Sequence, residues 1–186
     1  MSSAVLSRRS FLKVAGTVAL AANMPPLSAQ AATSPDLHAG DRFTMGSWGG
    51  EPIEWRVLEI ADGTALAISE RGLDCRPFNS SRAKGNGWET SDLKAWLERE
   101  FLPGAFSDDE QCRIREVTCL SVDEVKQYFS GDDDRICYPT AYAKAQGLWT
   151  FSSGRCLWWL RSPGSGGSES AAYVSRDGDV NTNGDY

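Results

Sequence analysis

Apolar and polar residues alternate along residues 53–60, a pattern typical of a strand that is buried on one face. Asp62-Gly63 follows as a turn signal, and residues 64–69 supply a second strand. The pattern therefore predicts an antiparallel hairpin. Residues 43–48 predict a strand before it, and residues 71–87, with several Gly, Pro, Asn and Ser, predict a long loop after it.

The hydrophobic period then changes from that of a strand to that of a helix. Apolar residues recur at helical spacing over residues 93–101, directly after the cap-forming residues 90–92. This spacing predicts an amphipathic helix that packs on a core. Pro103-Gly104 is expected to end it.

Shorter elements follow. Two capping-box patterns predict helices over residues 108–115 and 122–128, with a strand over residues 117–120 between them. Asp132-Asp133-Asp134 predicts a solvated turn. Residues 141–145 predict one more short helix, which Gly147 closes.

The last part of the chain returns to strand patterns. Residues 157–162 predict a buried strand, and residues 171–175 predict another, followed by a turn at Asp177-Gly178. Strands, then short helices, then strands predict an α+β fold with an antiparallel sheet. Residues 42–186 are expected to form a single domain, with residues 32–41 as a polar lead-in.

The N-terminus has the order of a targeting peptide. A basic head is followed by residues 14–22, which are mildly apolar and much shorter than the ~20 residues that span a bilayer. Small residues then suit a signal peptidase. Residues 1–31 are therefore predicted to be a twin-arginine signal, with its export residues at Arg8, Arg9, Phe11 and Leu12 and its cleavage site at Ala29 and Ala31.

This signal makes the twin-arginine translocase an expected partner and the periplasm, the cell surface or the medium the expected location. No later segment is apolar enough for stable membrane insertion. The formal net charge is −6, and removal of the signal makes it more negative. An acidic domain repels nucleic acid, so nucleic acid is excluded as a partner.

The numbers of cysteines and histidines limit the metal sites and catalytic sites that the chain can form. There are five cysteines and one histidine, His38, and no C-x-x-C motif. A Cys/His zinc site and a His-based catalytic triad are therefore not expected, and no cofactor is predicted. Because twin-arginine cargo folds in a reducing compartment, most cysteines are expected to be small buried groups.

Three segments carry a resemblance to a known family. They are residues 53–58, residues 88–97 and the run Trp-Trp-Leu-Arg-Ser-Pro-Gly at 158–164. Over residues 42–186 the chain resembles an uncharacterised bacterial family described only as a domain of unknown function. The C-terminal half of that family is similar to the C-type-lectin-like fold of formylglycine-generating enzymes. Its members continue to a Gly-Val-Arg-Pro-like closing strand, so the last strand is expected to be missing here.

The resemblance also implies a function. Some proteins of this lectin-like type are variable proteins of diversity-generating retroelements, whose C-terminal segment forms a diversified binding surface. The chain is accordingly expected to be an exported, non-enzymatic domain that binds a protein or glycan ligand. The alternatives are a relative of the formylglycine-generating oxidases, although no cysteine here matches their reactive pair, and a structural module of the cell envelope. The expected ligand-binding residues are Ser165, Ser168, Glu169, Tyr173, Arg176, Asp177, Asp179, Asn181, Asn183, Asp185 and Tyr186.

Residues 179–184 have two interpretations. They match the first half of a calcium-loop pattern, in which oxygens of Asp179, Asn181 and Asn183 would bind calcium. Alternatively, the segment contributes to two hairpin turns, at Asp177-Gly178 and Asn183-Gly184.

A second set of residues is expected to be structural. Trp158 and Trp159 are neighbours on a strand and face opposite sides, so at least one is expected in the core, although exposed aromatics can stack on a sugar. Arg161 is expected to form an ion pair or to hold backbone carbonyls. The full structural motif comprises Trp55, Trp96, Trp158, Trp159 and Arg161.

Overall fold

A computed structural model describes residues 15–18, 37–148 and 150–185. The predicted export and cleavage residues and Tyr186 lie outside these ranges. The strands are β1 (Ala15–Val18), β2 (Arg42–Trp48), β3 (Glu51–Ala61), β4 (Thr64–Ser69), β5 (Arg71–Gly72), β6 (Ile114–Thr118), β7 (Tyr138–Pro139), β8 (Trp158–Pro163), β9 (Ala171–Val174) and β10 (Val180–Asp185). The α-helices are α1 (Asp92–Trp96), α2 (Leu102–Ala105), α3 (Asp108–Gln111), α4 (Val122–Tyr128), α5 (Asp132–Arg135) and α6 (Ala141–Ala145), with 3-10 turns η1 (Arg82–Lys84) and η2 (Trp88–Thr90) and a π-helical segment η3 (Leu97–Phe101).

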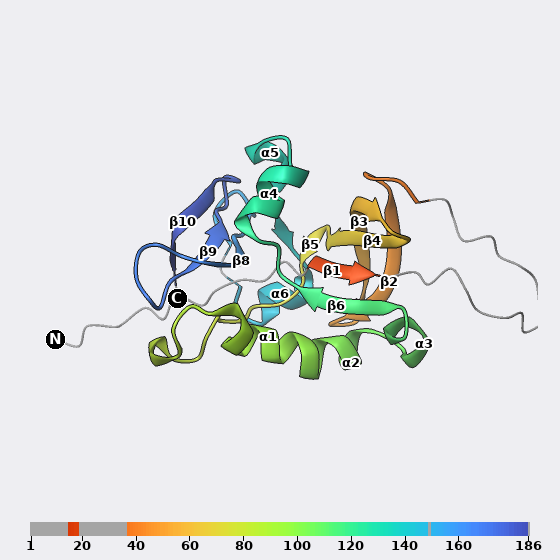
Figure 1. Cartoon of the computed structure of the whole chain (residues 1–186), viewed down its shortest axis with the longest axis horizontal. Helices are drawn as coiled ribbons and strands as arrows, with labels where there is room; N and C mark the ends of the chain where they lie inside the picture. The colour runs from red at the N-terminus through yellow and green to blue at the C-terminus, as the bar shows by residue number, and fades with distance from the viewer. Residues whose placement is uncertain (1–14, 19–36, 149, 186) are drawn as a thin grey trace, which may run out of the picture.

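The strands form two antiparallel sheets and one short parallel pair. The larger sheet has the order β2-β3-β4-β1-β6, and the smaller has the order β10-β9-β8. β5 pairs with β7 in parallel. Figure 1 shows the larger sheet on the right and the smaller on the left, with α1 to α3 below them and α4 and α5 above. This arrangement confirms the predicted α+β class with antiparallel sheets and short helices.

The predicted hairpin is β3 and β4, and its turn explains its register. Asp62 and Gly63 both have positive φ, at 50° and 69°. Two positive φ angles define a type I′ turn, whose twist matches that of the flanking strands. Ala61 therefore pairs directly with Thr64, and the apolar face of β3 is buried.

The hydrophobic core consists of two clusters of buried side chains. The first lies between the larger sheet and the segment α1–η3–α2, where Trp55, Leu97 and Phe101 are fully buried. The second joins α4, α6 and the smaller sheet and includes Val125 and Leu160. Burial of a large apolar side chain contributes roughly 1.5–3 kcal/mol.

β8 connects the two clusters because successive side chains on a strand face opposite sides. Trp159 belongs to the first cluster and Trp158 to the second, and both are fully buried. Each indole N–H has a partner, since Trp158 donates to the Arg135 carbonyl at 3.1 Å and Trp159 to the Arg76 carbonyl at 3.2 Å. Both tryptophans are therefore core residues.

The prediction that Pro103-Gly104 ends the first helix is wrong. The helix passes through the π-helical segment η3 and continues as α2 to Ala105. Pro103 stands in the first turn of α2, where a missing N–H is tolerated. The chain becomes extended only at Phe106.

Three further predictions need correction. The second helix ends at Gln111, and the strand expected over residues 117–120 lies instead at Ile114–Thr118. The acidic run is not a simple solvated turn, because Asp132, Asp133 and Asp134 form the first turn of α5, a position that the helix dipole favours for acidic groups.

Asn183-Gly184 is not a hairpin turn. It lies inside β10, a strand that the sequence pattern did not predict. β9 and β10 pair at Val174 and again at Ala171, with a register shift between, so Gly184 with its φ of 84° belongs to a bulge. The turn predicted at Asp177-Gly178 does connect β9 and β10.

β1 comes from the segment that the sequence analysis assigned to the export signal. Its backbone pairs antiparallel with β4 on one side and β6 on the other. The position of Thr17 in the sheet lies between those of Leu66 and Glu116. The larger sheet is thus continuous from β2 to β6 only through β1.

Candidate functional site

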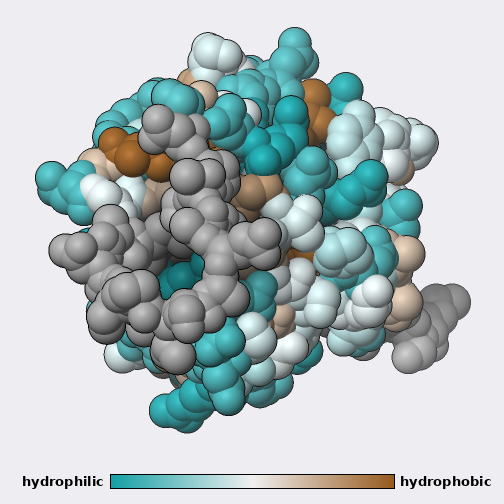
Figure 2. All heavy atoms as spheres, turned by 90° about the vertical axis from the view of Figure 1, so that its right-hand side faces the viewer, coloured by the Kyte–Doolittle hydropathy of each residue, from teal (hydrophilic) through white to brown (hydrophobic). Residues whose placement is uncertain are grey.

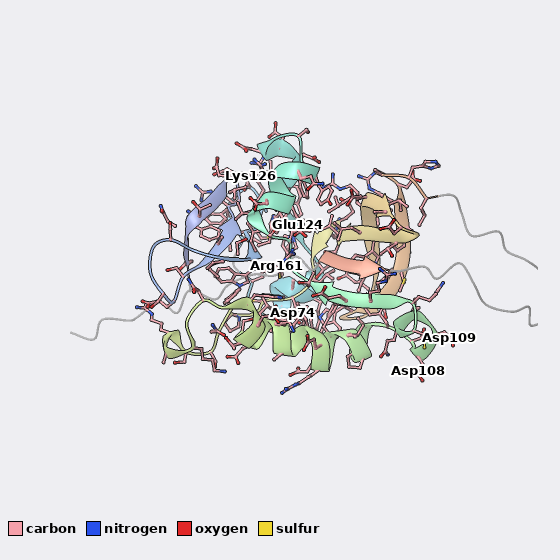
Figure 3. All side chains as sticks on the ribbon, in the orientation of Figure 1. Asp74, Asp108, Asp109, Glu124, Lys126 and Arg161 are labelled. Atoms are coloured by element: carbon pink, nitrogen blue, oxygen red, sulfur yellow. The ribbon has the colours of Figure 1, made fainter. Side chains whose placement is uncertain are left out.

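A pocket of about 390 Å³ opens where β4, β6 and the start of α4 meet η2 and the end of β8. Arg161 and Glu124 lie close together near the middle of the molecule in Figure 3. The residues lining the pocket are Leu66, Trp88, Glu89, Glu116, Thr118, Ser121, Glu124, Arg161, Ser162 and Pro163. A concave site with convergent polar groups is the usual form of a binding site.

The guanidinium of Arg161 is held by three acceptors. Its Nη1 donates to the Cys119 carbonyl at 2.6 Å and lies 2.6 Å from Oε2 of Glu124. Its Nη2 donates to Oε1 of Glu124 at 2.7 Å. This two-pronged contact fixes the orientation of both side chains. Arg161 is therefore pre-positioned at the pocket, with 29% of its side chain exposed.

Glu124 is fixed from its own helix as well. Ser121 N–H donates to Glu124 Oε2 at 2.6 Å, and Glu124 N–H donates to Ser121 Oγ at 3.2 Å, which completes the predicted capping box of α4. Burial by itself would raise the pKa of Glu124. The hydrogen bonds from Arg161 and Ser121 outweigh burial and lower that pKa below its ordinary value. Glu124 is thus a stable carboxylate at neutral pH.

Cys119 lies behind this pair and is fully buried. Burial raises the pKa of its thiol strongly, against a smaller opposite effect of Arg161. A thiol with a raised pKa stays protonated and is a poor nucleophile. Cys119 therefore contributes packing and a backbone acceptor to the site.

The pocket carries an excess of negative charge. Glu89, Glu116 and Glu124 contribute three carboxylates against the guanidinium of Arg161. Glu89 is 81% exposed at the rim, where its carboxylate lies 3.4 Å from Nζ of Lys94. Trp88 adds a largely buried aromatic wall. The surroundings favour a ligand with a positive charge and hydrogen-bond donors.

Asp74 is a second buried acid, which the sequence analysis did not single out. It accepts hydrogen bonds from Trp48 Nε1 at 3.0 Å and from the Cys75 N–H at 2.6 Å, and Arg76 Nε lies 3.5 Å away. The Arg76 guanidinium covers the ring of Trp96 at 4.7 Å. These contacts fasten the loop after β5 to the core, so Asp74 is a structural acid.

The predicted ligand-binding residues occupy both ends of the β9–β10 ribbon. Ser165, Ser168 and Glu169 lie in the loop before β9, which Asn86 holds by donating to three of its carbonyls. Asn183 and Asp185 are at the same end, because Asp185 pairs with Ala171 and the Asn183 carbonyl accepts from Gly166. Arg176, Asp177 and Asp179 lie at the opposite end, at the hairpin tip.

Tyr173 and Asn181 lie between these two ends and contact each other. Nδ2 of Asn181 donates to the Tyr173 hydroxyl at 2.9 Å. The Tyr173 ring packs edge-on against Trp159 at 6.2 Å. Tyr173 is therefore partly integrated into the first core cluster and presents only part of its ring to solvent.

The hairpin tip is bound to neighbouring elements. Arg135 Nε donates to the Gly178 carbonyl at 2.7 Å, and Gly178 packs directly against the Asp132 carbonyl. The Arg176 guanidinium lies over the Phe151 ring at 4.1 Å, and Arg155 forms a 3.5 Å ion pair with Asp177. The tip thus presents charged groups from a supported position.

Two of the residues proposed for calcium use a side-chain oxygen in a hydrogen bond within the hairpin. Asn181 Oδ1 accepts from the Gly184 N–H at 3.1 Å, while Asp179 Oδ2 accepts from Ser175 Oγ at 3.4 Å. Over residues 37–148 and 150–185, no three His, Cys, Asp or Glu side chains are grouped as a metal site would require. The bonds of Asp179 and Asn181 are those of a hairpin and its bulge.

The face on the β2–β3 side is predominantly hydrophilic. Figure 2 shows this face with scattered hydrophobic areas among hydrophilic ones, outside the part that grey atoms cover. Ile60 and Tyr138 are the large hydrophobic side chains exposed among the described residues, at 43% and 47%. No helix in the described part combines the length and hydropathy needed to cross a bilayer.

The fold and the pocket define a mixed α/β domain with a charged recess beside its smaller sheet. A family model described as "Domain of unknown function (DUF6273)" matches residues 62–125 and 121–186. The chain therefore belongs to the DUF6273 family. No curated protein and no solved structure matches it.

Only part of this site was predictable from the sequence. Arg161 was expected to be structural, and ligand binding was expected after it. Glu124 had no predicted role beyond the capping box of the helix over residues 122–128. The pocket residues Glu116 and Ser162 were not proposed. One sequence signal could have indicated the site. An arginine within a buried apolar strand requires a carboxylate nearby.

Proposed function

We propose that the chain is an exported, non-enzymatic binding domain whose ligand contacts the pocket beside Arg161. The observation that carries this proposal is the rigid Arg161–Glu124 pair next to two further carboxylates in a recess of about 390 Å³. The two side chains lose little conformational entropy when a ligand binds, because both are already held in place.

The ligand class follows from the charge of the pocket. Fixed carboxylate oxygens accept hydrogen bonds from hydroxyl and ammonium groups, and Trp88 offers an apolar wall. Of the expected ligands, protein or glycan, these features best suit a glycan that carries a free amino group. Ser162 and Pro163 line the pocket and lead into the loop before β9, so that loop would extend the contact surface.

The binding proposal can be tested with a pair of matched oligosaccharides. Titration calorimetry on the full chain would compare a glucosamine tetrasaccharide with its fully N-acetylated counterpart, which lacks the positive charges. We expect the amino form to bind more tightly. Glu116→Gln should weaken its binding by up to roughly fivefold, the order expected for one exposed charge contact.

A remote charge change serves as the control. Glu100→Gln removes an exposed carboxylate on the π-helical segment η3, outside the pocket lining, and should leave the affinity unchanged. Equal binding of the amino and N-acetylated sugars, or equal effects of the two substitutions, would contradict a charge-reading pocket.

Export rests on the order of residues 1–31, which combines paired arginines, an apolar stretch and a small-residue cleavage site. Changing Arg8 and Arg9 together to Lys should retain the chain in the cytoplasm, because the paired arginines identify this class of signal. Cell fractionation measures the result. Unchanged export of that variant would assign the chain to another route.

A C-type-lectin-like arrangement is proposed for the domain as a whole. It is supported by the order of a hairpin sheet, then helices, then a second antiparallel sheet that contains the Trp-Trp-Leu-Arg-Ser-Pro-Gly segment. An experimental structure of the domain with a different strand order would refute this assignment.

A further inference from the structure

Two of the five cysteines stand directly opposite each other. Cys137, just before β7, and Cys156, just before β8, form an isolated antiparallel bridge. Cys156 N–H donates to the Cys137 carbonyl at 2.9 Å, and the Cys156 thiol lies 3.5 Å from the same oxygen. Both side chains belong to the second core cluster and are 0% and 1% exposed.

This placement suits a covalent link between the two thiols. Opposed residues of an antiparallel pair have Cα atoms about 4.5–5.5 Å apart, within the range of about 4.4–6.8 Å that disulfides bridge. Side chains of opposed residues lie on the same face of the pair. The bridge is isolated and lies outside the named strands.

The link would act on the surface assigned to binding. The residues just before Cys156 support the β9–β10 tip, through Arg155 to Asp177 and through Phe151 beneath Arg176. Cys137 follows α5, whose Arg135 holds the Gly178 carbonyl of the same tip. A bond between Cys137 and Cys156 would therefore join the two supports of the hairpin tip.

We propose that Cys137 and Cys156 are a dithiol that becomes an intramolecular disulfide after export, a proposal that rests on the extracytoplasmic location given above. The co-reactant is a disulfide-bearing oxidant outside the cytoplasm. Because both thiols are buried, exchange takes place from a locally opened state. In that state one thiolate attacks the oxidant to form a mixed disulfide, and the second cysteine displaces the reduced oxidant sulfur. Two electrons and two protons pass to the oxidant, which leaves as a dithiol or as two thiols.

Peptide mapping of the full chain tests this directly. Trypsin places Cys137 in residues 136–144 and Cys156 in residues 156–161, and every other cysteine falls in a separate peptide. After thiols are blocked in intact cells, the exported protein should yield the 136–144/156–161 pair as one linked species. The Arg8→Lys/Arg9→Lys variant, which is expected to stay in the cytoplasm, should yield both peptides in blocked form.

A second experiment tests disulfide formation between the two cysteines independently of where the protein is located. Purified full-length chain in a buffer of mainly oxidised glutathione should form the same linked peptide, and Cys112→Ser, which removes an exposed thiol, should not change it. If the linked peptide forms in this buffer but the protein is not exported in cells, the extracytoplasmic location is refuted and the assignment of Cys137 and Cys156 as a dithiol stands. Blocked thiols in the glutathione arm, or blocked thiols in protein that has been exported, would overturn the proposal.

Discussion

Arg161→Met is the most informative perturbation of the site. It removes the charge and the hydrogen bonds while keeping most of the apolar stem. Glu124 would lose its guanidinium partner, and the Cys119 carbonyl would lose a 2.6 Å donor. Both consequences are destabilising because the pair is mostly shielded, with 29% and 26% of the two side chains exposed.

The loss of folding free energy caused by Arg161→Met lies between two limits. Breaking a fully buried pair costs about 3–5 kcal/mol, and an exposed pair contributes about 0–1 kcal/mol. The intermediate exposure of Arg161 and Glu124 places the expected loss at about 2–3 kcal/mol at pH 7. For a chain of this length, that loss lowers Tm by roughly 4–12 °C.

Urea denaturation followed by tryptophan fluorescence measures the loss. Arg99→Met, at an exposed position of the helix, is the matched control and should change stability by less than about 0.5 kcal/mol. Glu124→Gln should also cost about 2–3 kcal/mol, because it leaves the Arg161 guanidinium without its carboxylate.

The pH dependence gives an independent check. The pKa of Glu124 is lower in the folded protein than its ordinary value of 4.5, so its contribution to stability is present above that value and is lost as pH falls through the folded pKa. The cost of Arg161→Met should therefore shrink in acid. A cost no greater than that of Arg99→Met, or one that does not change with pH, would refute the assigned role of the pair.

Three further predictions concern other elements. In thermal denaturation, Gly178→Ala should cost about 3 kcal/mol or more, because φ is +89° and the new Cβ would lie 1.9 Å from the Asp132 carbonyl oxygen. In the same assay Gly63→Ala, where φ is also positive but the space is open, should cost only about 1 kcal/mol. Ser107→Ala should cost about 1 kcal/mol by urea denaturation, since it removes the capping box of α3, and an unchanged midpoint would argue against that box. Removal of residues 1–31 should speed amide exchange in β4 and β6, where β1 now pairs, and unchanged exchange would show that β1 does not protect them.

Local patterns predicted much of the secondary structure. The alternation at 53–60, the Asp62-Gly63 turn and both capping boxes were correct, because each depends on residues close in the chain. The errors arose where distant contacts decide the outcome. Pro103-Gly104 stays helical because the π-helical segment η3 precedes it and α2 packs on β2.

The site shows the same division. The sequence pointed to Arg161 as a charge that needs a partner, and Glu124 does ion-pair with it, yet nothing local indicated that residue. Glu124 and Arg161 are 37 positions apart and meet only because α4 packs against β8. The predicted ligand-binding residues were selected by type, and their division between the two ends of one ribbon follows from strand pairing.

The sequence alone determined the α+β class, the hairpin of β3 and β4, the helix starts at Ser107 and Ser121, and the resemblance to a family of unknown function. These features depend on side-chain period, turn conformation and capping, all of which act over a few residues. Tertiary structure decided the pocket beside Arg161, the opposed Cys137 and Cys156, and the pairing of β1. Each of these needs segments that meet only after the two core clusters have formed, because long-range packing brings them together.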